Sequence, residues 1–461
     1  MSALAAELDG IDLGDQRLNR RARRVLAKLG EKPTLSIPAA CGGWHETRAA
    51  YRLFDHDAVT AEAVLAPHIA RTVERIGAHP RVLCIEDTSE IDSAGKPSMQ
   101  GLGPLNLETR QGLYLHPTLA VTPERLCLGL LNSTAGCVSS VAWGRTRTPS
   151  APWKTRKVCA GWTAIGRSTN SRSNCPRPAS RMWPTAKPIS TTCSWRPHAP
   201  KPPPTGWCAA STTGSWPTAR PCASTWPPRR CSPRPPSSGR PVTASRRHGV
   251  TACTVHQELR AVRVTLPAPR RPDRTLPAVE ITALLASEPA PPTGEAPVEW
   301  LLLTNLPVDT PAQALEKIQW YLCRWQIEVY FRILKSGCRI EQLQLEKRER
   351  LEPALACYLI VAWRVLFLTM LGRACPEMPC DVVFDTAEWH AVYIVTERQP
   401  PPDTPPTLDQ MVRMVAGLGG FQGRKSDGFP GPQTLWIGLQ RAADFVLAMA
   451  AQRGVGEGRY G

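Results

Sequence analysis

The chain has 461 residues, of which 21% are charged and 6% aromatic, a composition ordinary for a soluble protein of two or three domains. It contains no run of about 18 apolar residues, so we expect no membrane span. Its N-terminus lacks the basic start and apolar core of a secretory signal. Its 16 cysteines form no CxxC pair, which favours a reduced, cytosolic setting.

The net charge of +17 comes from one segment of unusual composition. From Arg125 to Gln257 there is no Asp or Glu in 133 residues, whereas 20 of these residues are Lys or Arg. Outside this segment 36 basic and 39 acidic residues remain, which leaves a net charge of −3. The basic character of the whole chain is therefore no argument for nucleic-acid binding.

Residues 1–75 predict a small helical domain. Apolar residues recur at helical spacing between residues 13 and 30, at Leu18, Ala22, Val25, Leu26 and Leu29. The other side of this helix carries five arginines: Arg17, Arg20, Arg21, Arg23 and Arg24. Such cations can hold DNA phosphates, and an exposed basic face without a ligand is an equally simple interpretation. A further helix is expected within PTLSIPAACGGWHETRAAYRLFDH, residues 33–56.

A short apolar strand is predicted from Val82 to Ile85, and Glu86-Asp87-Thr88 ends it. A carboxylate at the end of a core strand can reach a metal at the sheet edge, although a lone Asp at such a place more often forms a turn. Residues 112–131 predict a hairpin with its turn at 122–124. We therefore expect three antiparallel strands, with Asp87 at the end of the first.

The segment from about 133 to 250 shows no apolar period of 2 or 3.6, and Pro, Arg, Ser, Thr, Trp and Cys dominate it. A disordered basic linker is one interpretation, and a basic arm that binds nucleic acid is another. Eight of the 15 tryptophans lie between Trp143 and Trp226, which argues against disorder. A mixture of this kind without acids is what a GC-rich gene gives when it is read in the wrong frame.

The frame hypothesis can be tested on Met182 to Cys193, MWPTAKPISTTC. One permitted back-translation, read from its third base, gives Val-Ala-Asp-Arg-Glu-Ala-Asp-Ile-Tyr-Asp-Leu. We infer a frameshift near residues 131–135 and a compensating one near 248–256, so that residues 133–250 are not expected to fold natively. The first Asp codon of that alternative frame would span Pro184 and Thr185, and neither side chain can replace a carboxylate.

The rest of the chain has ordinary patterning. Strands are expected within 255–269, 279–288 and 298–307, and a helix over 310–337 begins with Thr310 as N-cap and Pro311 behind it. A strongly apolar, buried helix is expected over 348–373. Helices then alternate with loops in three further segments: 387–395, 408–421 and 434–452.

Four polar residues share one stripe of the helix from Tyr321 to Lys335, with the spacing Y-x2-R-x3-E-x6-K. At about 100° per residue, Tyr321, Arg324, Glu328 and Lys335 fall within an arc of about 60°. The carboxylate can ligate Mg²⁺ or Mn²⁺, the cations can hold phosphates and the ring can pack on sugar or base. A solvated face with ion pairs is the alternative.

This spacing resembles a motif of the IS-four family of insertion-sequence DDE transposases, whose best-known member is the transposon-five enzyme. Other parts of the chain are similar to the same family: the PTLSIPAACGGW run, Glu86-Asp87-Thr88, and GGFQGRKSDGFPGPQTLWIGLQR near the C-terminus. The Asp-Arg-Glu-x-Asp of the alternative frame resembles the family's second-acid motif. The resemblance covers about residues 1–131 and 255–461.

The resemblance implies an α/β protein with an RNase H-like catalytic core, a mixed sheet with helices, between two helical domains. The implied domains are a DNA-binding domain at 1–75, the DDE core at 76–373 and a dimerisation domain at 374–461. Asp87 and Glu328 would be two of three acids that hold paired Mg²⁺ or Mn²⁺ ions, and the second Asp would be missing. The nearest carboxylates along the chain are Glu124 and Glu258.

The resemblance also implies contacts with DNA. Arg324 and Lys335 would hold phosphates of the transposon end, and Tyr321 would pack against it. Trp300 would help to hold a flipped base, which needs an aromatic partner, although core packing explains this Trp equally well. The arginines of the N-terminal helix would bind the same DNA.

The function implied is that of a cut-and-paste transposase that binds insertion-sequence ends and target DNA as a homodimer. It would be a cytoplasmic, nucleoid-associated bacterial protein that does not bind membranes. Because the second acid is missing, we expect this chain to be catalytically defective. The alternative function is a non-catalytic regulator that occupies transposon ends or dimerises with active subunits.

Overall fold

The computed structural model describes most of the chain outside the acid-free segment. The described residues are 4–93, 99–107, 110–136, 163–166, 224–225, 229–230, 252–253, 256–268, 277–289, 291, 297–425 and 427–457. Pro184, Thr185 and most of the segment that we expect to be out of frame lie outside the described residues. Within that segment the described parts are the last four residues of a strand that ends at Gly136 and three short strands: β6 (Thr163–Gly166), β7 (Ser224–Thr225) and β8 (Arg229–Arg230).

The N-terminal region is helical, as the sequence predicts. Asp15 begins the first long helix by accepting a hydrogen bond from the Arg17 amide at 2.7 Å. This helix buries the apolar side that the spacing predicts, including Leu18, Leu26 and Leu29. The elements of this region are η1 (Ala5–Leu8), α1 (Gln16–Glu31), α2 (Ile37–Cys41), α3 (Trp44–Phe54) and α4 (Ala61–Gly77).

The first sheet contains the predicted strand and hairpin. Its strands are β1 (Arg81–Glu86), β2 (Ser89–Asp92), β3 (Gly103–Pro104), β4 (Gln111–Val121), β5 (Cys127–Gly136) and β6. The long strand β4 pairs antiparallel with β5 on one edge, and with β1 and β2 in succession on the other. The three antiparallel strands expected around Asp87 are therefore confirmed.

Asp87 lies where the pairing of β1 and β2 with β4 is interrupted. Glu86 pairs with Thr118 and Ser89 with Leu115, so the register places Asp87 opposite Pro117. Proline has no amide hydrogen to donate to a ladder and is therefore found at interruptions of a sheet. The gap leaves Asp87 and Thr88 outside the ladder at the end of a buried strand.

The strands expected near residues 255–307 form a second sheet with a core of its own. They are β10 (His256–Leu266), β11 (Val279–Ser287) and β12 (Glu299–Thr304), and β7 pairs with β10. Leu259, Leu284 and Leu302 pack with Ile318 of the following helix. A two-stranded pair of β8 and β9 (Ala252–Cys253) completes the described strands, and every described pairing between these named strands is antiparallel.

The expectation of one regular helix over residues 310–337 is wrong in detail. The segment forms α6 (Pro311–Cys323), α7 (Trp325–Arg332) and a π-helical turn η3 (Ile333–Gly337). Thr310 and Gln313 form the capping box that begins α6. The break falls at Arg324, because the Ile327 amide bonds to the Arg324 carbonyl three residues back, at 3.1 Å. The 100° spacing therefore does not hold from Tyr321 to Lys335.

The π turn brings the chain close to the C-terminal helix. The Cys338 amide donates to the Ile333 carbonyl five residues back, at 2.7 Å. Gly337 then lies so close to Trp436 that an added Cβ would stand 2.9 Å from the indole ring. The wide π turn and the absence of a side chain at Gly337 together let the backbone lie against Trp436.

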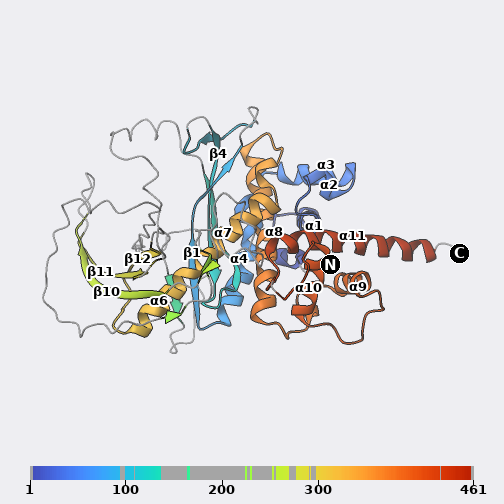
Figure 1. Cartoon of the computed structure of the whole chain (residues 1–461). Helices are drawn as coiled ribbons and strands as arrows, with labels where there is room; N and C mark the ends of the chain where they lie inside the picture. Colours follow the sequence, from blue (N-terminus) through green and yellow to red (C-terminus); the bar gives the residue numbers. More distant parts are fainter. Residues whose placement is uncertain are drawn as a thin grey trace, which may run out of the picture.

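The central helix α8 (Arg348–Ala374) is the apolar core helix that the sequence predicts. It runs between the first sheet and the helices of the two termini (Figure 1). Its N-terminal half shares one apolar cluster with α1, α3, α4 and the first sheet. Its C-terminal half shares a second cluster with the remaining elements η5 (Cys380–Val382), α9 (Thr386–Glu397), α10 (Leu408–Leu418) and α11 (Pro432–Glu457).

Among the described residues one helix, α8, is long and apolar enough to cross a membrane. However, 89% of its most apolar window is buried inside the protein. Burial of this kind is what the core helix of a folded domain shows.

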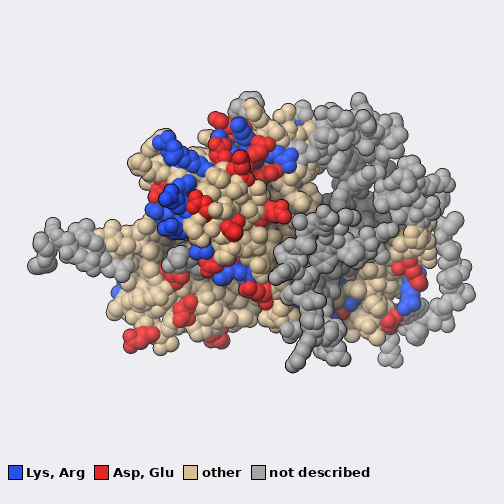
Figure 2. Space-filling model, turned by 180° about the vertical axis from the view of Figure 1, so that it is seen from behind, with Lys and Arg blue, Asp and Glu red and all other residues tan. Residues whose placement is uncertain are grey.

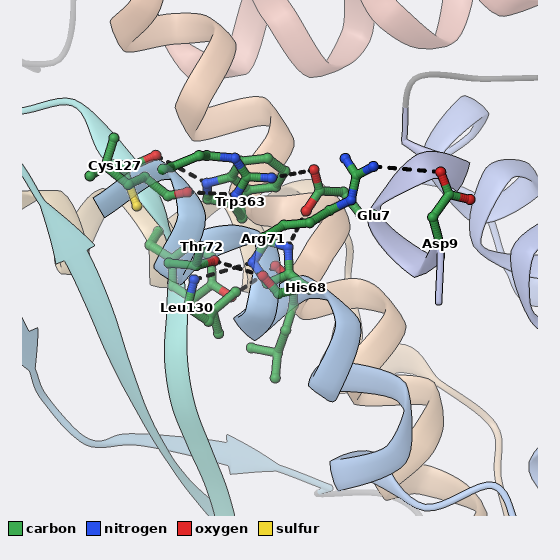
Figure 3. A network of polar contacts seen from close by, with 12 residues as sticks. Glu7, Asp9, His68, Arg71, Thr72, Cys127, Leu130 and Trp363 are labelled. Atoms are coloured by element: carbon green, nitrogen blue, oxygen red, sulfur yellow. Dashed lines mark hydrogen bonds and ion pairs between the residues drawn. The ribbon is translucent and has the colours of Figure 1, made fainter. Parts of the chain in front are cut away.

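A buried polar network of Glu7, His68, Arg75 and Trp363 fastens η1 to α4, β5 and α8. Glu7 accepts from the His68 Nδ1 group at 2.5 Å (Figure 3). It also accepts from the Arg75 guanidinium. The Leu130 amide donates to His68 Nε2 at 3.2 Å. Since a backbone amide can only donate, His68 is the neutral tautomer with its hydrogen on Nδ1.

The other two members hold the network to the sheet. Arg75 lies 4.4 Å above the Trp363 ring and donates to the Leu128 carbonyl at 2.8 Å. The Trp363 indole donates to the Cys127 carbonyl at 3.0 Å. Burial lowers the pKa of His68 from 6.5, against the opposing effect of Glu7. Burial raises the pKa of Glu7, but the His68 hydrogen bond and the Arg75 charge outweigh it and the net pKa lies below its usual value.

We predict that the free energy of unfolding falls as the pH falls below 6.5. In that range His68 binds a proton in the unfolded chain but stays neutral in the folded chain, so protons favour unfolding. Below about pH 4.5 Glu7 is protonated more readily in the unfolded chain, which lowers the free energy of unfolding further. His68→Gln should cost about 1–3 kcal/mol at pH 7.5 and should reduce the slope between pH 7.5 and 5.5. Urea unfolding followed by tryptophan fluorescence measures both quantities.

The matched control is His45→Gln, because His45 is exposed on α3. That variant should keep the stability and the pH slope of the unmodified protein. Equal pH slopes for the His68 and His45 variants would contradict the role given to the buried imidazole.

Candidate active site

Two of the predicted acids meet at one cation. Asp87 follows β1, Glu328 lies in the first turn of α7, and Arg324 stands at the junction of α6 and α7. The Arg324 Nη2 atom forms an ion pair with Asp87 Oδ2 and lies 3.3 Å from Glu328 Oε1. The side chains of Arg324 and Asp87 are about one fifth exposed, and that of Glu328 is 35% exposed.

Local structure explains this meeting. Arg324 and Glu328 are four residues apart, so they are neighbours on a helical surface even across the tightened turn at Arg324. The gap in the first sheet leaves Asp87 free of ladder hydrogen bonds, and its Oδ1 accepts the Thr88 amide at 2.8 Å. One carboxylate oxygen of Asp87 is thus held by its own loop and the other by Arg324.

A second polar cluster joins the end of β1 to β4. Glu86 is the last residue of β1, directly before Asp87. Glu86 Oε1 accepts from Thr118 Oγ1 at 2.9 Å, and its Oε2 lies 4.0 Å from His116 Nε2. His116 Nδ1 and Thr88 Oγ1 are 2.8 Å apart. This cluster was not predicted. The available sequence signal was the spacing of two residues between Glu86 and Thr88 and between His116 and Thr118.

The other members of the predicted stripe lie in separate contacts. Lys335 Nζ is 3.5 Å from Glu341 Oε1, which also accepts the Asp92 amide at 3.2 Å. The rings of Trp300 and Tyr321 have centroids 5.9 Å apart and are inclined by 58°. Both rings pack against the core of the second sheet. The structure therefore brings Asp87, Arg324 and Glu328 together, pairs Trp300 with Tyr321, and joins Lys335 to an acid that the sequence did not single out.

The donor set around Arg324 fits part of a site for Mg²⁺ or Mn²⁺. Both ions prefer carboxylate oxygens, and Asp87 and Glu328 share one small region. In the described part of the chain no group of three or more His, Cys, Asp or Glu residues that could hold a metal is present. Glu124 and Glu258 therefore do not complete the set, and Glu258 forms an ion pair with Arg260 in the second sheet at 3.1 Å.

The basic side of α1 is partly engaged within the protein. Arg24 pairs with Glu46 at 2.8 Å, and Arg20 Nε donates to the Gln16 carbonyl at 3.4 Å. Arg23 is held by Asp9 and by the Leu8 carbonyl. Arg17 and Arg21 have no ion-pair partner among the described residues. Figure 2 shows Lys and Arg side chains gathered on the side of the molecule that carries the N-terminal helices.

An aromatic and basic groove, which no sequence pattern predicted, lies beside this face. Trp44, at the start of α3, is 72% exposed. The groove is lined by Trp44, Thr47, Arg48, Tyr51, Arg52, Asp55 and Arg350. Arg350 of α8 forms an ion pair with Asp55, which fixes the end of α3 against the central helix. Exposed cations beside exposed rings suit a nucleic-acid backbone.

Three family matches cover the two ends of the chain and the site helix. Residues 1–59 match the family described as Transposase DNA-binding, residues 237–363 match Transposase DDE domain, and residues 360–458 match Transposase Tn5 dimerisation domain. Glu328 lies inside the DDE match, whereas Asp87 lies in a part of the chain that none of the three covers.

Each match indicates what its region of the chain does. The DDE match places residues 237–363 in a nuclease and transposase family, and a DDE domain implies the use of divalent metal. The other two domains make DNA and a second copy of the chain its partners. Together with the mixed α/β architecture around α8, they show that the chain belongs to the Tn5-like DDE transposases.

Proposed function

We propose that this chain descends from a cut-and-paste transposase that binds the ends of an insertion sequence, cleaves them and joins them to target DNA. The meeting of Asp87 and Glu328 at Arg324 is the observation that supports this proposal most directly. In it, an acid after β1 and an acid of the DDE match lie within reach of one small cation. Residues 1–75 would bind DNA, 76–373 would cut it and 374–461 would dimerise.

The roles of the residues follow from their chemistry. Asp87 and Glu328 would hold divalent cations, of which Mg²⁺ is our choice and Mn²⁺ the alternative, and these would activate the attacking oxygen and stabilise the leaving one. Arg324 and Lys335 would grip phosphates of the transposon end, Tyr321 would pack against its backbone and Trp300 would stack on a displaced base.

We propose further that the chain as translated does not cleave DNA. A third carboxylate is required, and the frame hypothesis places its codon across Pro184 and Thr185. The alternative function is a regulator that binds transposon ends or pairs with active subunits without cutting. The folded N-terminal helices and the C-terminal helices around α8 favour this alternative for the unrepaired chain.

We predict that repairing the reading frame restores cleavage. The gene segment for residues 125–260 would first be resequenced. The reading frame would then be corrected between about residues 131 and 256 to give the repaired gene. The repaired protein should nick end-containing DNA with Mg²⁺ or Mn²⁺. Glu328→Gln in the repaired protein should lower the cleavage rate by at least about a thousandfold, since a metal ligand is removed.

Arg332→Gln is the control for the repaired protein, since Arg332 is exposed on the same helix and bonds to Gln433. This control should keep its cleavage rate. A repaired protein that binds ends and never cuts them would rule out the assignment of Asp87 and Glu328.

We predict that the cations of α1 hold phosphates. In the double variant Arg17→Gln/Arg21→Gln, the slope of log K against log salt should become shallower by about 0.9 for each lost contact. Arg23→Gln is the comparison, because Asp9 and the Leu8 carbonyl already hold Arg23. Fluorescence anisotropy with a duplex of the flanking terminal repeat measures this slope, and equal slopes in both variants would remove α1 from the interface.

We predict that α11 is part of the dimer contact. It extends beyond the rest of the molecule (Figure 1), and its outer part exposes Leu447 at 44%. Leu447→Asp should weaken dimerisation by roughly tenfold or more, since burial of a leucine side chain contributes about 1.5–3 kcal/mol. Sedimentation equilibrium measures the constant.

Val382→Asp is the control for this experiment, because Val382 is an exposed apolar residue of the same region outside α11. The dimerisation constant of the Val382 variant should equal that of the unmodified protein. Weakening by the Val382 variant alone would place the contact elsewhere on the C-terminal helices.

A further inference from the structure

The guanidinium of Arg324 occupies the region between the two acids that the proposed function assigns to metal binding. A single nitrogen, Nη2, contacts Asp87 Oδ2 and Glu328 Oε1. The other oxygen of Asp87 is held by the Thr88 amide. A cation of the protein itself is therefore already bound to one oxygen of each acid.

A divalent cation and this guanidinium compete for the same oxygens. Two carboxylates carry two negative charges, which one guanidinium half neutralises. A divalent cation bound by Oδ2 and Oε1 would stand beside the positive Nη2 atom, and like charges a few ångströms apart repel strongly where water is scarce. The Arg324 side chain is only 19% exposed, so solvent screens that repulsion weakly. Metal binding therefore requires the guanidinium to move away.

A DNA phosphate is the group best suited to bind the Arg324 guanidinium once it leaves the two acids. The planar guanidinium matches phosphate oxygens with two parallel hydrogen bonds, and it exchanges a carboxylate for a phosphate without losing a charged partner. Arg324 lies at a junction between two helices, and α7 carries Glu328 on its next turn. A phosphate that draws Arg324 away would free both acids together.

We infer that Arg324 is a latch that couples DNA binding to metal binding. Without DNA the guanidinium holds Asp87 and Glu328 and keeps their affinity for divalent cations low. When a phosphate takes the guanidinium, the acids become available, and a phosphate oxygen can add to the ligands of the cation. The coupling is reciprocal, so metal also strengthens DNA binding by the same factor. This inference rests on the proposed function, because it takes the same two acids as metal ligands.

A purely structural role for Arg324 predicts something different. An ion pair that only fixes the acids would, when removed, lower the melting temperature and leave metal affinity unchanged or weaker. A latch predicts that its removal strengthens metal binding in the absence of DNA. The sign of the change in metal affinity therefore separates the two roles.

The test measures Mn²⁺ affinity of the full chain by the electron paramagnetic resonance signal of free Mn²⁺, with and without a saturating duplex of the terminal repeat. In the unmodified protein, DNA should tighten Mn²⁺ binding by about 5–150-fold. Arg324→Gln should bind Mn²⁺ more tightly than the unmodified protein without DNA, and DNA should add little. Arg332→Gln removes the same charge from the exposed side of α7 and should behave like the unmodified protein.

Arg324→Met, whose unbranched side chain fills similar space without charge, serves as a second variant if Arg324→Gln does not fold. If Mn²⁺ affinity without DNA is no higher in the Arg324 variants than in Arg332→Gln, the latch is wrong. An unmodified protein that binds the duplex with no change in Mn²⁺ affinity would also overturn it. A protein that binds no duplex at all would contradict the proposed function, while the comparison without DNA would still decide the latch.

Discussion

Burial of α8 is the constraint on which the rest of the structure depends. The helix is apolar on all sides, so it has to be covered on all sides to be stable in water. The N-terminal helices and part of the first sheet cover its first half. The C-terminal helices, with Val82, Ala120, Leu126 and Leu128 of the first sheet and its hairpin, cover its second half. The regions implied by the family matches are thereby joined through one helix, and α4, which crosses the expected boundary at residue 75, packs directly on it. The break between the DDE and dimerisation matches, near residue 360, falls inside this helix.

Much of this fold follows from patterns that are short in sequence. The strand before Asp87, the hairpin of β4 and β5, the capping box at Thr310 and the buried helix α8 each depend on neighbouring residues, so periodicity and end signals were sufficient. The break at Arg324 and the π turn before Cys338 were not predictable in this way. They depend on Asp87, which lies 237 residues away in sequence from Arg324, and on the approach of Gly337 to Trp436. The separation of the second sheet from the first also depends on long-range packing that no single segment encodes.

The candidate site shows the same division. The sequence singled out Asp87, Arg324 and Glu328 one by one, and the structure brings these three side chains together. The sequence did not indicate the pairing of Lys335 with Glu341, because η4 (Ile340–Gln342) begins at Arg339 in a left-handed conformation that returns the chain toward β2. The polar cluster of Glu86 and His116 was also not predicted, since its members come from two strands that only the pairing of β1 with β4 brings together.

The buried polar network has a geometric consequence for the way DNA would be read. It ties η1 of the N-terminal region to β5, the strand beside the one that faces Asp87, and does so through groups that cannot part without leaving a buried charge unpaired. A duplex held on α1 would then lie at a fixed distance and angle from the acids. Each base pair advances a strand by about 3.4 Å, so a fixed distance would place the two acids at one phosphodiester bond, a set number of base pairs from the bound sequence. In such an arrangement the fold would set the number of base pairs between the bound DNA sequence and the cleaved bond. The base sequence of the DNA end could then change more freely than this number of base pairs.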